Sequence, residues 1–408
     1  MNPKRIYIVE DDLAVLRLEE HILKSLGWEV KSSTSAEKAY NEIINFKPSC
    51  ILLDIMLPGM DGLELCKMLR SNKDFNDVYI IIVSLKAYNF DKERALSFGA
   101  DGYITKPFNK DKFEKAFNSI ISINLEFWGI RGTLPVPGKK AIKYGGNTSC
   151  VSVRFSQNRW FIFDAGTGIK EFSDYIIRAG QNRIKANIFI SHSHWDHINA
   201  FPFFAPLYIP GNEIIVYGPY QSDNHTMRKV ISDQMFGIYF PIGVKEFAAH
   251  VDYKDLREGS YDIDGIEVKT KLLTHPGNCL GYRINYKAIS ICYITDNELY
   301  LPNSEYFNST AWEQLIEFIE GADILIHDAT YFDDEYKKKV NWGHSCVSQV
   351  VKLAHEASVK KLYLYHQEPD QTDADIERKL KIANELLSNL GSSTICLVPV
   401  EKEKIMVR

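Results

Sequence analysis

The sequence predicts an α/β protein of two domains: a parallel sheet of five β/α units over residues 1–122, and an αββα sandwich of two sheets flanked by helices over residues 124–408. Three observations predict this organisation. The chain has 408 residues, and single hydrophobic cores stop growing near about 250–300 residues. Short apolar strands alternate with helical periodicity in the first part. Strands separated by glycine- and proline-rich loops dominate the second.

The first domain consists of short apolar runs separated by segments with helical spacing of apolar residues, such as 13–23 and 63–69. This alternation is typical of a parallel sheet with helices on both faces. The predicted strands are 6–9, 29–31, 50–53, 78–83 and 103–105.

The second domain is richer in strands. Predicted strands are 125–128, 151–155, 160–163, 188–190, 214–217, 266–272, 282–284, 289–294, 324–326 and 362–365, and predicted helices are 167–178, 310–320, 346–356 and 373–389. Two strand-rich halves with outer helices indicate two packed sheets. The joint near 120–124 has no glycine-, serine- or proline-rich linker, so we expect the two domains to be coupled.

Composition limits the function classes. The net charge of −5 argues against a protein whose main task is to hold duplex nucleic acid. The seven cysteines show irregular spacing and no Cys-x-x-Cys, which favours a reducing cytoplasm over a disulfide framework. We expect no signal peptide and no membrane span, because no apolar run approaches the ~20 residues that a span needs.

Polar residues stand at the strand ends of the first domain, namely Glu10, Asp11, Asp54, Ser84 and Lys106. The carboxyl ends of parallel strands form a ligand crevice, so we expect these side chains to converge. Clustered carboxylates favour Mg²⁺, and a lysine and a hydroxyl can hold phosphoryl oxygens. A lone aspartate after a strand is more often a helix N-cap. The conjunction of five positions favours a phosphoryl site with Asp54 as nucleophile.

The second domain contains a dense histidine cluster. His192, His194, Asp196 and His197 fall within six residues of a chain with 11 histidines in total. Such nitrogen and carboxylate donors suit Zn²⁺, Mn²⁺ or iron, and one ion cannot easily take all four from so short a stretch. Two ions are therefore predicted, the alternative being a surface or pH-sensitive cluster. Further candidate ligands after predicted strands are His275, Asp296 and His366.

Residues 1–122 resemble the receiver domain of two-component response regulators, which has a flavodoxin-like (βα)5 fold. The stretch 54–62, Asp-Ile-Met-Leu-Pro-Gly-Met-Asp-Gly, is also receiver-like. The resemblance implies phosphorylation of Asp54 by a sensor histidine kinase. The other roles that it implies are Mg²⁺ ligands for Glu10, Asp11 and Asp54, the hydroxyl switch for Ser84, the aromatic switch for Tyr103 and the phosphate-binding lysine for Lys106.

Residues 124–408 resemble the metallo-β-lactamase superfamily, whose signature His-x-His-x-Asp-His matches 192–197. The resemblance implies an αββα sandwich with two divalent metals, zinc being favoured over manganese or iron. The implied ligand sets are His192, His194 and His275 for one metal, Asp196, His197 and His366 for the other, and Asp296 for both.

Within that superfamily the chain is most similar to the phosphodiesterase branch. This branch includes tRNA 3′-processing endonuclease Z, the cyclic phosphodiesterase of phosphonate breakdown and enzymes that degrade cyclic nucleotides. Segments 127–133, 144–149 and 164–168 resemble sequence segments of this branch, although their glycines are also ordinary turn residues. The Asp-Ala-Thr at 328 and Gly-His-Ser at 343 imply that His344 is the proton donor and that Asp328 orients it.

Two residues keep two interpretations each. Asp164 either caps a helix or orients metal ligands. Arg131 either meets a phosphate or pairs with a carboxylate.

The resemblances predict a response regulator with a dimetal phosphodiesterase output, controlled by phosphorylation of Asp54 and working as a homodimer. The predicted substrate is a cyclic nucleotide or another small phosphodiester. The reason is that segment 217–250 is short and holds little basic charge, unlike the arm with which the endonuclease grips tRNA. The alternatives are a nuclease on RNA or DNA, a β-lactam, thioester or other non-phosphate ester hydrolase, and a non-catalytic metal module.

Overall fold

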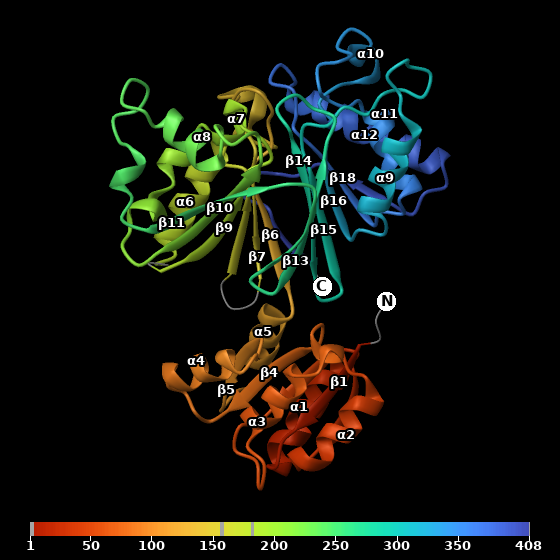
Figure 1. Cartoon of the computed structure of the whole chain (residues 1–408). Helices are drawn as coiled ribbons and strands as arrows, with labels where there is room; N and C mark the ends of the chain where they lie inside the picture. Colours follow the sequence, from red (N-terminus) through yellow and green to blue (C-terminus); the bar gives the residue numbers. More distant parts are fainter. Residues whose placement is uncertain (1–3, 156–158, 181–182, 408) are drawn as a thin grey trace. The chain divides into compact units, whose positions relative to one another are not determined.

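The structure is a computed structural model that describes residues 4–155, 159–180 and 183–407. The chain divides into two compact units, the first made mainly of residues up to Ile123 and the second made mainly of Asn124–Met406 (Figure 1). Within the described ranges no helix is long and apolar enough to cross a membrane.

The N-terminal unit is a five-stranded parallel sheet of order β2-β1-β3-β4-β5, which confirms the predicted fold class. Its strands are β1 (Arg5–Val9), β2 (Glu29–Ser33), β3 (Cys50–Leu53), β4 (Tyr79–Ser84) and β5 (Gly102–Thr105). Its helices are α1 (Leu13–Ser25), α2 (Ala36–Phe46), α3 (Gly62–Arg70), α4 (Asn89–Ser97) and α5 (Lys110–Ile120).

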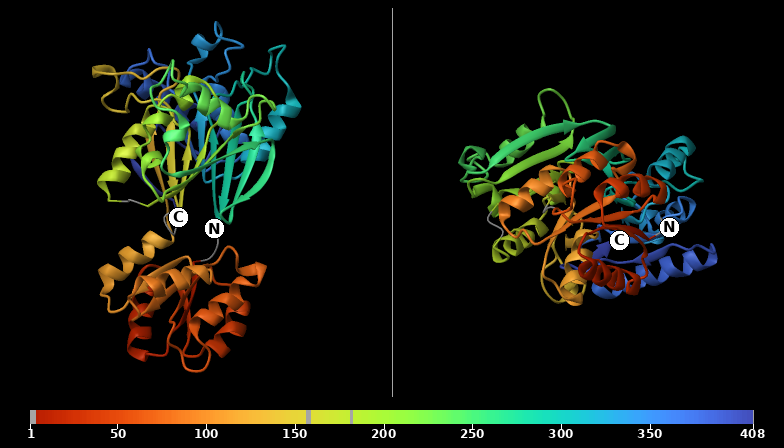
Figure 2. Two further views of the ribbon diagram at one scale, coloured as in Figure 1. Left: turned by 60° about the vertical axis from the view of Figure 1, so that its left-hand side comes forward. Right: turned by 90° about the horizontal axis from the view of Figure 1, so that it is seen from below.

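Both faces of this sheet are buried, because successive residues of a strand point to opposite sides. Ile6 and Ile8 of β1 pack into one hydrophobic cluster, and Tyr7 and Val9 pack into another. Figure 2 shows helices on both faces of the sheet. This double burial explains why the strands read as continuous apolar runs.

The C-terminal unit contains two seven-stranded sheets, of order β11-β10-β9-β8-β7-β6-β19 and β12-β13-β14-β15-β16-β17-β18. The first comprises β6 (Ile123–Gly129), β7 (Cys150–Arg154), β8 (Arg159–Phe163), β9 (Lys185–Phe189), β10 (Glu213–Pro219), β11 (His250–Leu256) and β19 (Lys404–Val407). The second comprises β12 (Gly259–Ile263), β13 (Ile266–Leu272), β14 (Leu280–Tyr286), β15 (Ile289–Ile294), β16 (Ile324–Asp328), β17 (Lys361–Tyr365) and β18 (Ile395–Leu397).

Helices cover the outer faces of these two sheets, giving the predicted αββα sandwich (Figure 1). The first sheet carries α6 (Gly168–Arg178) and α8 (Met227–Gln234). The second carries α9 (Ser309–Ile319), α11 (Val347–Glu356) and α12 (Asp373–Asn389). Two single-turn helices, α7 (Trp195–Ile198) and α10 (Asp333–Tyr336), lie in loops.

The strands that the sequence analysis did not predict, β11, β12, β18 and β19, lie at the edges of the sheets. Side chains of β11 alternate between exposed and half-buried and include Asp252 and Lys254. Edge strands often carry charges that discourage pairing with other chains. The apolar signal of such strands is therefore weak.

An aromatic layer fills the space between the two sheets. The Phe163 ring of β8 lies 5.8 Å from the ring of Tyr282 and 5.1 Å from that of Tyr293, both on the second sheet. Phe127 of β6 makes a similar contact with Tyr363 of β17, at 5.3 Å. Aromatic rings bury much area and add about 0.5–1.5 kcal/mol per well-placed pair, so this layer sets how the sheets meet.

We predict that Phe163→Ala destabilises the C-terminal unit by about 3–5 kcal/mol, because it removes a buried ring and leaves a cavity. Chemical denaturation of the whole chain measures this change. Phe236→Ala is the matched control, since that ring is 59% exposed, and it should change stability by no more than about 0.5 kcal/mol. Equal effects of the two substitutions would contradict a structural role for the layer.

Candidate functional site

The predicted metal ligands lie in loops that follow strands of both sheets. His192, His194, Asp196 and His197 follow β9 of the first sheet, and His275, Asp296 and His366 follow β13, β15 and β17 of the second. The structure brings all of them together in two groups whose ligand atoms lie within 4.8 Å of one another. One group contains His192, His194, His275 and Asp296, and the other contains Asp196, His197 and His366.

Asp296 lies between the two groups. Its Oδ1 is 3.2 Å from Nε2 of His197 and 3.1 Å from Nε2 of His366. Its Oδ2 is 3.6 Å from Nε2 of both His192 and His275. One carboxylate oxygen therefore faces each group, which is the arrangement that a shared ligand needs.

Two buried nitrogens test whether this arrangement fits metal ions. Within the described part of the chain, Nε2 of His192 and Nε2 of His197 are buried and make no hydrogen bond, whereas Nδ1 of His192 lies 3.1 Å from the Ser191 hydroxyl. Burial holds the pKa of His192 well below its ordinary value, so its imidazole is neutral and offers a lone pair. Unpartnered buried polar atoms are costly, and two divalent cations would satisfy both nitrogens and balance the buried carboxylates.

Asp164, at the end of β8, orients His197. Its carboxylate accepts hydrogen bonds from Nδ1 of His197 at 2.8 Å, from the backbone and hydroxyl of Ser191 at 2.7 and 2.9 Å, and from the Tyr293 hydroxyl at 2.8 Å. With Nδ1 held in this way, Nε2 faces the site. Of the two interpretations of Asp164, the geometry supports the orientation of ligands.

His344 and Asp328 form a pair beside these groups. Nδ1 of His344 lies 2.8 Å from Oδ2 of the fully buried Asp328. Oδ1 of Asp328 accepts from the backbone and hydroxyl of Thr330, at 2.9 and 2.6 Å. Burial lowers the pKa of His344, but the Asp328 and Asp296 carboxylates outweigh it and raise the pKa to about 9. The His344 ring stacks at 4.9 Å from His366, so it faces the candidate centre.

Arg131 has a structural position. Its guanidinium is fully buried and donates to the carbonyl oxygens of Gly145 and Gln371, at 3.0 and 2.6 Å, and lies 4.0 Å from the Asp373 carboxylate. It therefore ties loops together and does not face the candidate centre.

Three residues near the centre were not predicted, namely Ser191, Tyr293 and Glu298. Ser191 directly precedes the histidine motif, and Tyr293 is an inward-facing residue of β15. Their neighbours in the sequence gave only a weak indication that they lie near the centre. Glu298 gave none, because its partners lie about 40 residues further along the chain.

The acidic cluster of the N-terminal unit also forms. Carboxylate oxygens of Glu10, Asp11 and Asp54 lie within 4.8 Å of one another. Nζ of Lys106 is 2.5 Å from Glu10 and 2.7 Å from Asp54. Burial by itself lowers the pKa of Lys106, but the hydrogen bonds to these two carboxylates have the larger combined effect. The pKa is therefore raised above its ordinary value, and the lysine is charged.

The two predicted switch residues flank that cluster. Ser84 is buried at the end of β4. Tyr103 lies on β5 and donates its hydroxyl to the carbonyl of Lys86 at 2.6 Å. Ser84 lies on β4, the strand that pairs with β3 beside Asp54, and Tyr103 lies on β5, which pairs with the other side of β4.

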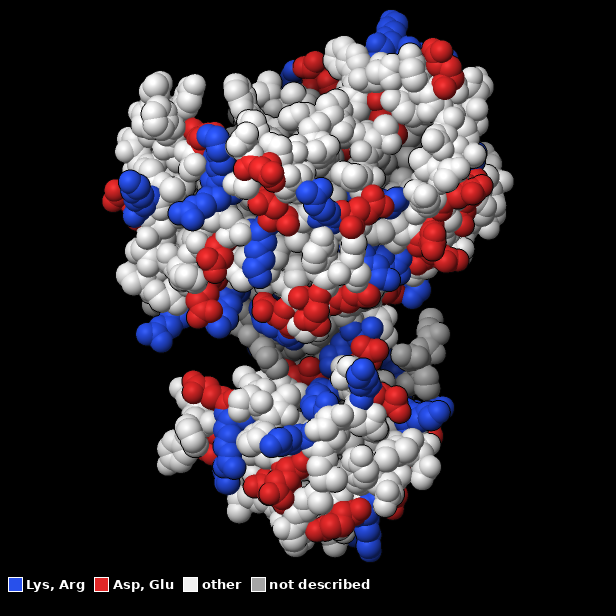
Figure 3. All heavy atoms as spheres, viewed as in Figure 1, with Lys and Arg blue, Asp and Glu red and all other residues white. Residues whose placement is uncertain are grey.

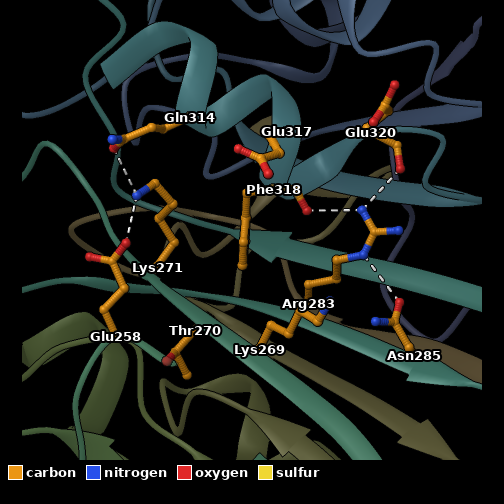
Figure 4. Close-up of a pocket in the computed structure, with 10 residues that line it drawn as sticks. All are labelled: Glu258, Lys269, Thr270, Lys271, Arg283, Asn285, Gln314, Glu317, Phe318 and Glu320. Atoms are coloured by element: carbon orange, nitrogen blue, oxygen red, sulfur yellow. Dashed lines mark hydrogen bonds and ion pairs between the residues drawn. The ribbon is translucent and has the colours of Figure 1, made fainter. Parts of the chain in front are cut away.

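A cavity of about 540 Å³ between α9 and strands β13 and β14 contains none of these site residues (Figure 4). Two of its basic side chains are engaged by the surrounding residues. Lys271 bonds to Glu258 and Gln314, and Arg283 donates to the carbonyls of Phe318 and Glu320. These bonds hold α9 on the sheet.

Comparison with known proteins follows this division. A model of the response regulator receiver domain matches residues 6–118, and a model of the β-lactamase superfamily domain matches residues 159–367. The chain is 35% identical over 118 residues to the alkaline phosphatase synthesis transcriptional regulatory protein PhoP of Bacillus subtilis, covering 29% of this chain and 48% of PhoP. It is 32% identical over 108 residues to protein PilG of Pseudomonas aeruginosa, covering 26% of this chain and 80% of PilG.

Among solved structures, the metallo-β-lactamase fold protein YhfI of Bacillus subtilis aligns with a TM-score of 0.52 at 15% identity, covering 70% of this chain and 100% of YhfI. That likeness shows the fold. Fold and site together define a metallo-hydrolase class joined to a receiver. The chain belongs to the β-lactamase superfamily and carries an N-terminal response regulator receiver domain. Its fold implies that it binds divalent metal.

We predict that Asp164→Asn weakens zinc binding by about 10–100-fold, because the amide no longer orients His197 as the carboxylate does. Competition with a chromogenic chelator measures the affinity. Asp174→Asn is the control, since Asp174 pairs with Lys170 and Arg178 on the surface of α6. Unchanged zinc affinity in Asp164→Asn would show that His197 is not a ligand or does not need this support.

Proposed function

We propose that this protein is a response regulator whose C-terminal unit hydrolyses a small phosphodiester, a cyclic nucleotide being the leading candidate. One observation carries the proposal. Two histidine–aspartate groups share Asp296, and the His344–Asp328 pair faces the same centre. The receiver domain would be controlled by a sensor histidine kinase that phosphorylates Asp54. The seven cysteines are free and buried, which supports action in the reducing cytoplasm.

His192, His194 and His275 would hold one ion and Asp196, His197 and His366 the other, with Asp296 as shared ligand. Zinc is favoured, with manganese or iron as alternatives. Bound ions would supply Lewis acidity and a water of lowered pKa. The chain itself fixes the positions of the ligands through Asp164 and the other buried partners.

His344 would protonate the leaving oxygen. Asp328 accepts a hydrogen bond from Nδ1–H, and the pKa of His344, raised to about 9 by the neighbouring carboxylates, keeps the ring doubly protonated, so that Nε2 would carry the proton that is donated. General acid catalysis of this kind contributes about 10²–10⁴-fold. Asp328 would act by keeping His344 in this orientation.

A small substrate is favoured over nucleic acid. On the face shown in Figure 3, lysines and arginines alternate with acidic residues and form no continuous basic stripe. The segment between β10 and β11 exposes Phe236, Ile238 and Tyr239, which are not groups that grip phosphates. A nuclease and a non-phosphate ester hydrolase remain the alternatives.

We predict that zinc-loaded protein hydrolyses 3′,5′-cyclic nucleotides and that His194→Ala loses at least about 100-fold in kcat/KM. The expected loss reflects removal of a metal ligand. Product formation measured by chromatography checks this. His250→Ala is the control, because His250 is exposed and lies outside both groups.

A panel of bis(4-nitrophenyl) phosphate, a β-lactam and a thioester separates the alternatives. Turnover of the β-lactam or thioester alone would overturn the phosphodiesterase proposal. Turnover of RNA or DNA without any cyclic nucleotide would favour the nuclease.

We predict that beryllofluoride changes the hydrolysis rate by about fivefold or more, as expected for a coupling of 1 kcal/mol or more between two sites. Beryllofluoride would bind to the Asp54 carboxylate, so Asp54→Ala should abolish the change. Rates with and without beryllofluoride are compared once binding to the receiver is verified. Equal rates would refute control by the receiver.

A further inference from the structure

Glu298 is a buried acid two residues beyond Asp296, with only 3% of its surface exposed. Its carboxylate accepts three hydrogen bonds. Oε1 accepts from the Tyr336 hydroxyl at 2.8 Å and the Asn341 backbone N–H at 2.7 Å, and Oε2 accepts from the Gly343 backbone N–H at 2.7 Å. All three donors are neutral, so the buried charge depends on these bonds.

The loop that Glu298 holds leads directly to two site residues. The carbonyl oxygen of Gly343 lies 2.8 Å from Nδ1 of His275, and His344 is the next residue. Gly343 has a φ of +84°, and any Cβ there would collide with the His275 ring. The backbone of Gly343 is thus fixed by Glu298 on its N–H side and fixes His275 on its carbonyl side.

A second contact anchors the other side of His344. The Ser345 hydroxyl donates to the Asn297 carbonyl at 2.5 Å and accepts from the Leu299 backbone at 3.1 Å. The chain on either side of Glu298 therefore clamps the residue after His344, while Glu298 itself holds the residues before it. Glu298 itself accepts the Gly343 N–H, and Gly343 is the residue whose carbonyl contacts His275.

We propose that Glu298 is a positioning residue that acts through Gly343 on both His275 and His344. By fixing the Gly343 peptide, it sets the tautomer and direction of the His275 ring, so that Nε2 faces Asp296 at 3.6 Å. Because His344 follows Gly343, the same hydrogen bond also positions the backbone of His344 so that its ring meets Asp328. The effect on His344 rests on the proposed phosphodiesterase function, whereas the effect on His275 concerns metal affinity alone.

The test compares Glu298→Gln with Tyr336→Phe. An amide has one acceptor oxygen, so Glu298→Gln cannot accept from both Gly343 and Asn341. Tyr336→Phe removes one bond to Oε1 and leaves the bond to Gly343 in place. In chelator competition with zinc alone, Glu298→Gln should lower the affinity for one of the two ions about 10-fold or more. Tyr336→Phe should stay within about twofold of wild type, since it leaves the His275 contact intact.

Leaving groups provide the second readout. If His344 is displaced, kcat for a cyclic nucleotide, whose leaving group is an alkoxide, should fall about 10–100-fold in Glu298→Gln. The kcat for bis(4-nitrophenyl) phosphate should fall far less, because nitrophenolate leaves without protonation. His344→Ala should show the same selectivity, and the double variant should show little further loss.

Three results decide the proposal. Wild-type zinc affinity in Glu298→Gln, or equal losses for both leaving groups, would overturn it, as would additive losses in the double variant. If Glu298→Gln does not fold, Glu298→Asp replaces it: the charge stays but the reach shortens, and zinc affinity should again fall. A wild-type protein that cleaves no phosphodiester would refute the proposed function, while the zinc measurement would still test Glu298.

Discussion

The register between the two sheets of the C-terminal unit controls the candidate centre, because each sheet supplies half of it. The histidine motif follows β9 of one sheet, and His275, Asp296 and His366 follow strands of the other. Besides the aromatic layer, tyrosine hydroxyls cross the interface: Tyr282 donates to the carbonyl of Ile190 at 2.7 Å and Tyr365 to that of Gly129 at 2.6 Å. Ile190 lies two residues before His192, so the bond that joins the sheets also places the first ligand.

Buried carboxylates then fix the orientation of individual histidines within the centre. Asp164, Asp328 and Glu298 each accept several hydrogen bonds, and each has a histidine of the centre as its partner or one residue away from its partner. A charge buried without a cation is stable only when its oxygens are fully used. These acids therefore have little freedom to move, and neither have the rings that they hold.

The sequence was enough to predict the strands that precede the candidate ligands in both sheets, and to predict the residues at the ends of those strands. Parallel strands place their carboxyl ends together, so Asp54 and Lys106, or Asp296 and His366, could be expected to meet although they are distant in the chain. Edge strands such as β11 were missed because exposed, charged strands carry little apolar pattern. Glu298 was missed because one acid after a strand says nothing about which distant loop it will hold. The two interpretations of Arg131 could not be separated, since its hydrogen bonds go to carbonyl oxygens, which every residue has, and its carboxylate partner Asp373 lies far along the chain.

The buried Nε2 of His192, which makes no hydrogen bond among the described residues, has a consequence for how long the protein lasts in a cell. Each buried atom without a partner costs about 1–3 kcal/mol, a large part of the net stability of an ordinary domain. Ions that bind only the folded chain repay this cost in proportion to the logarithm of their free concentration. The supply of metal would then govern the fraction of chains exposed to proteases as well as the fraction able to react. Starvation for metal would then lower the abundance of the protein itself.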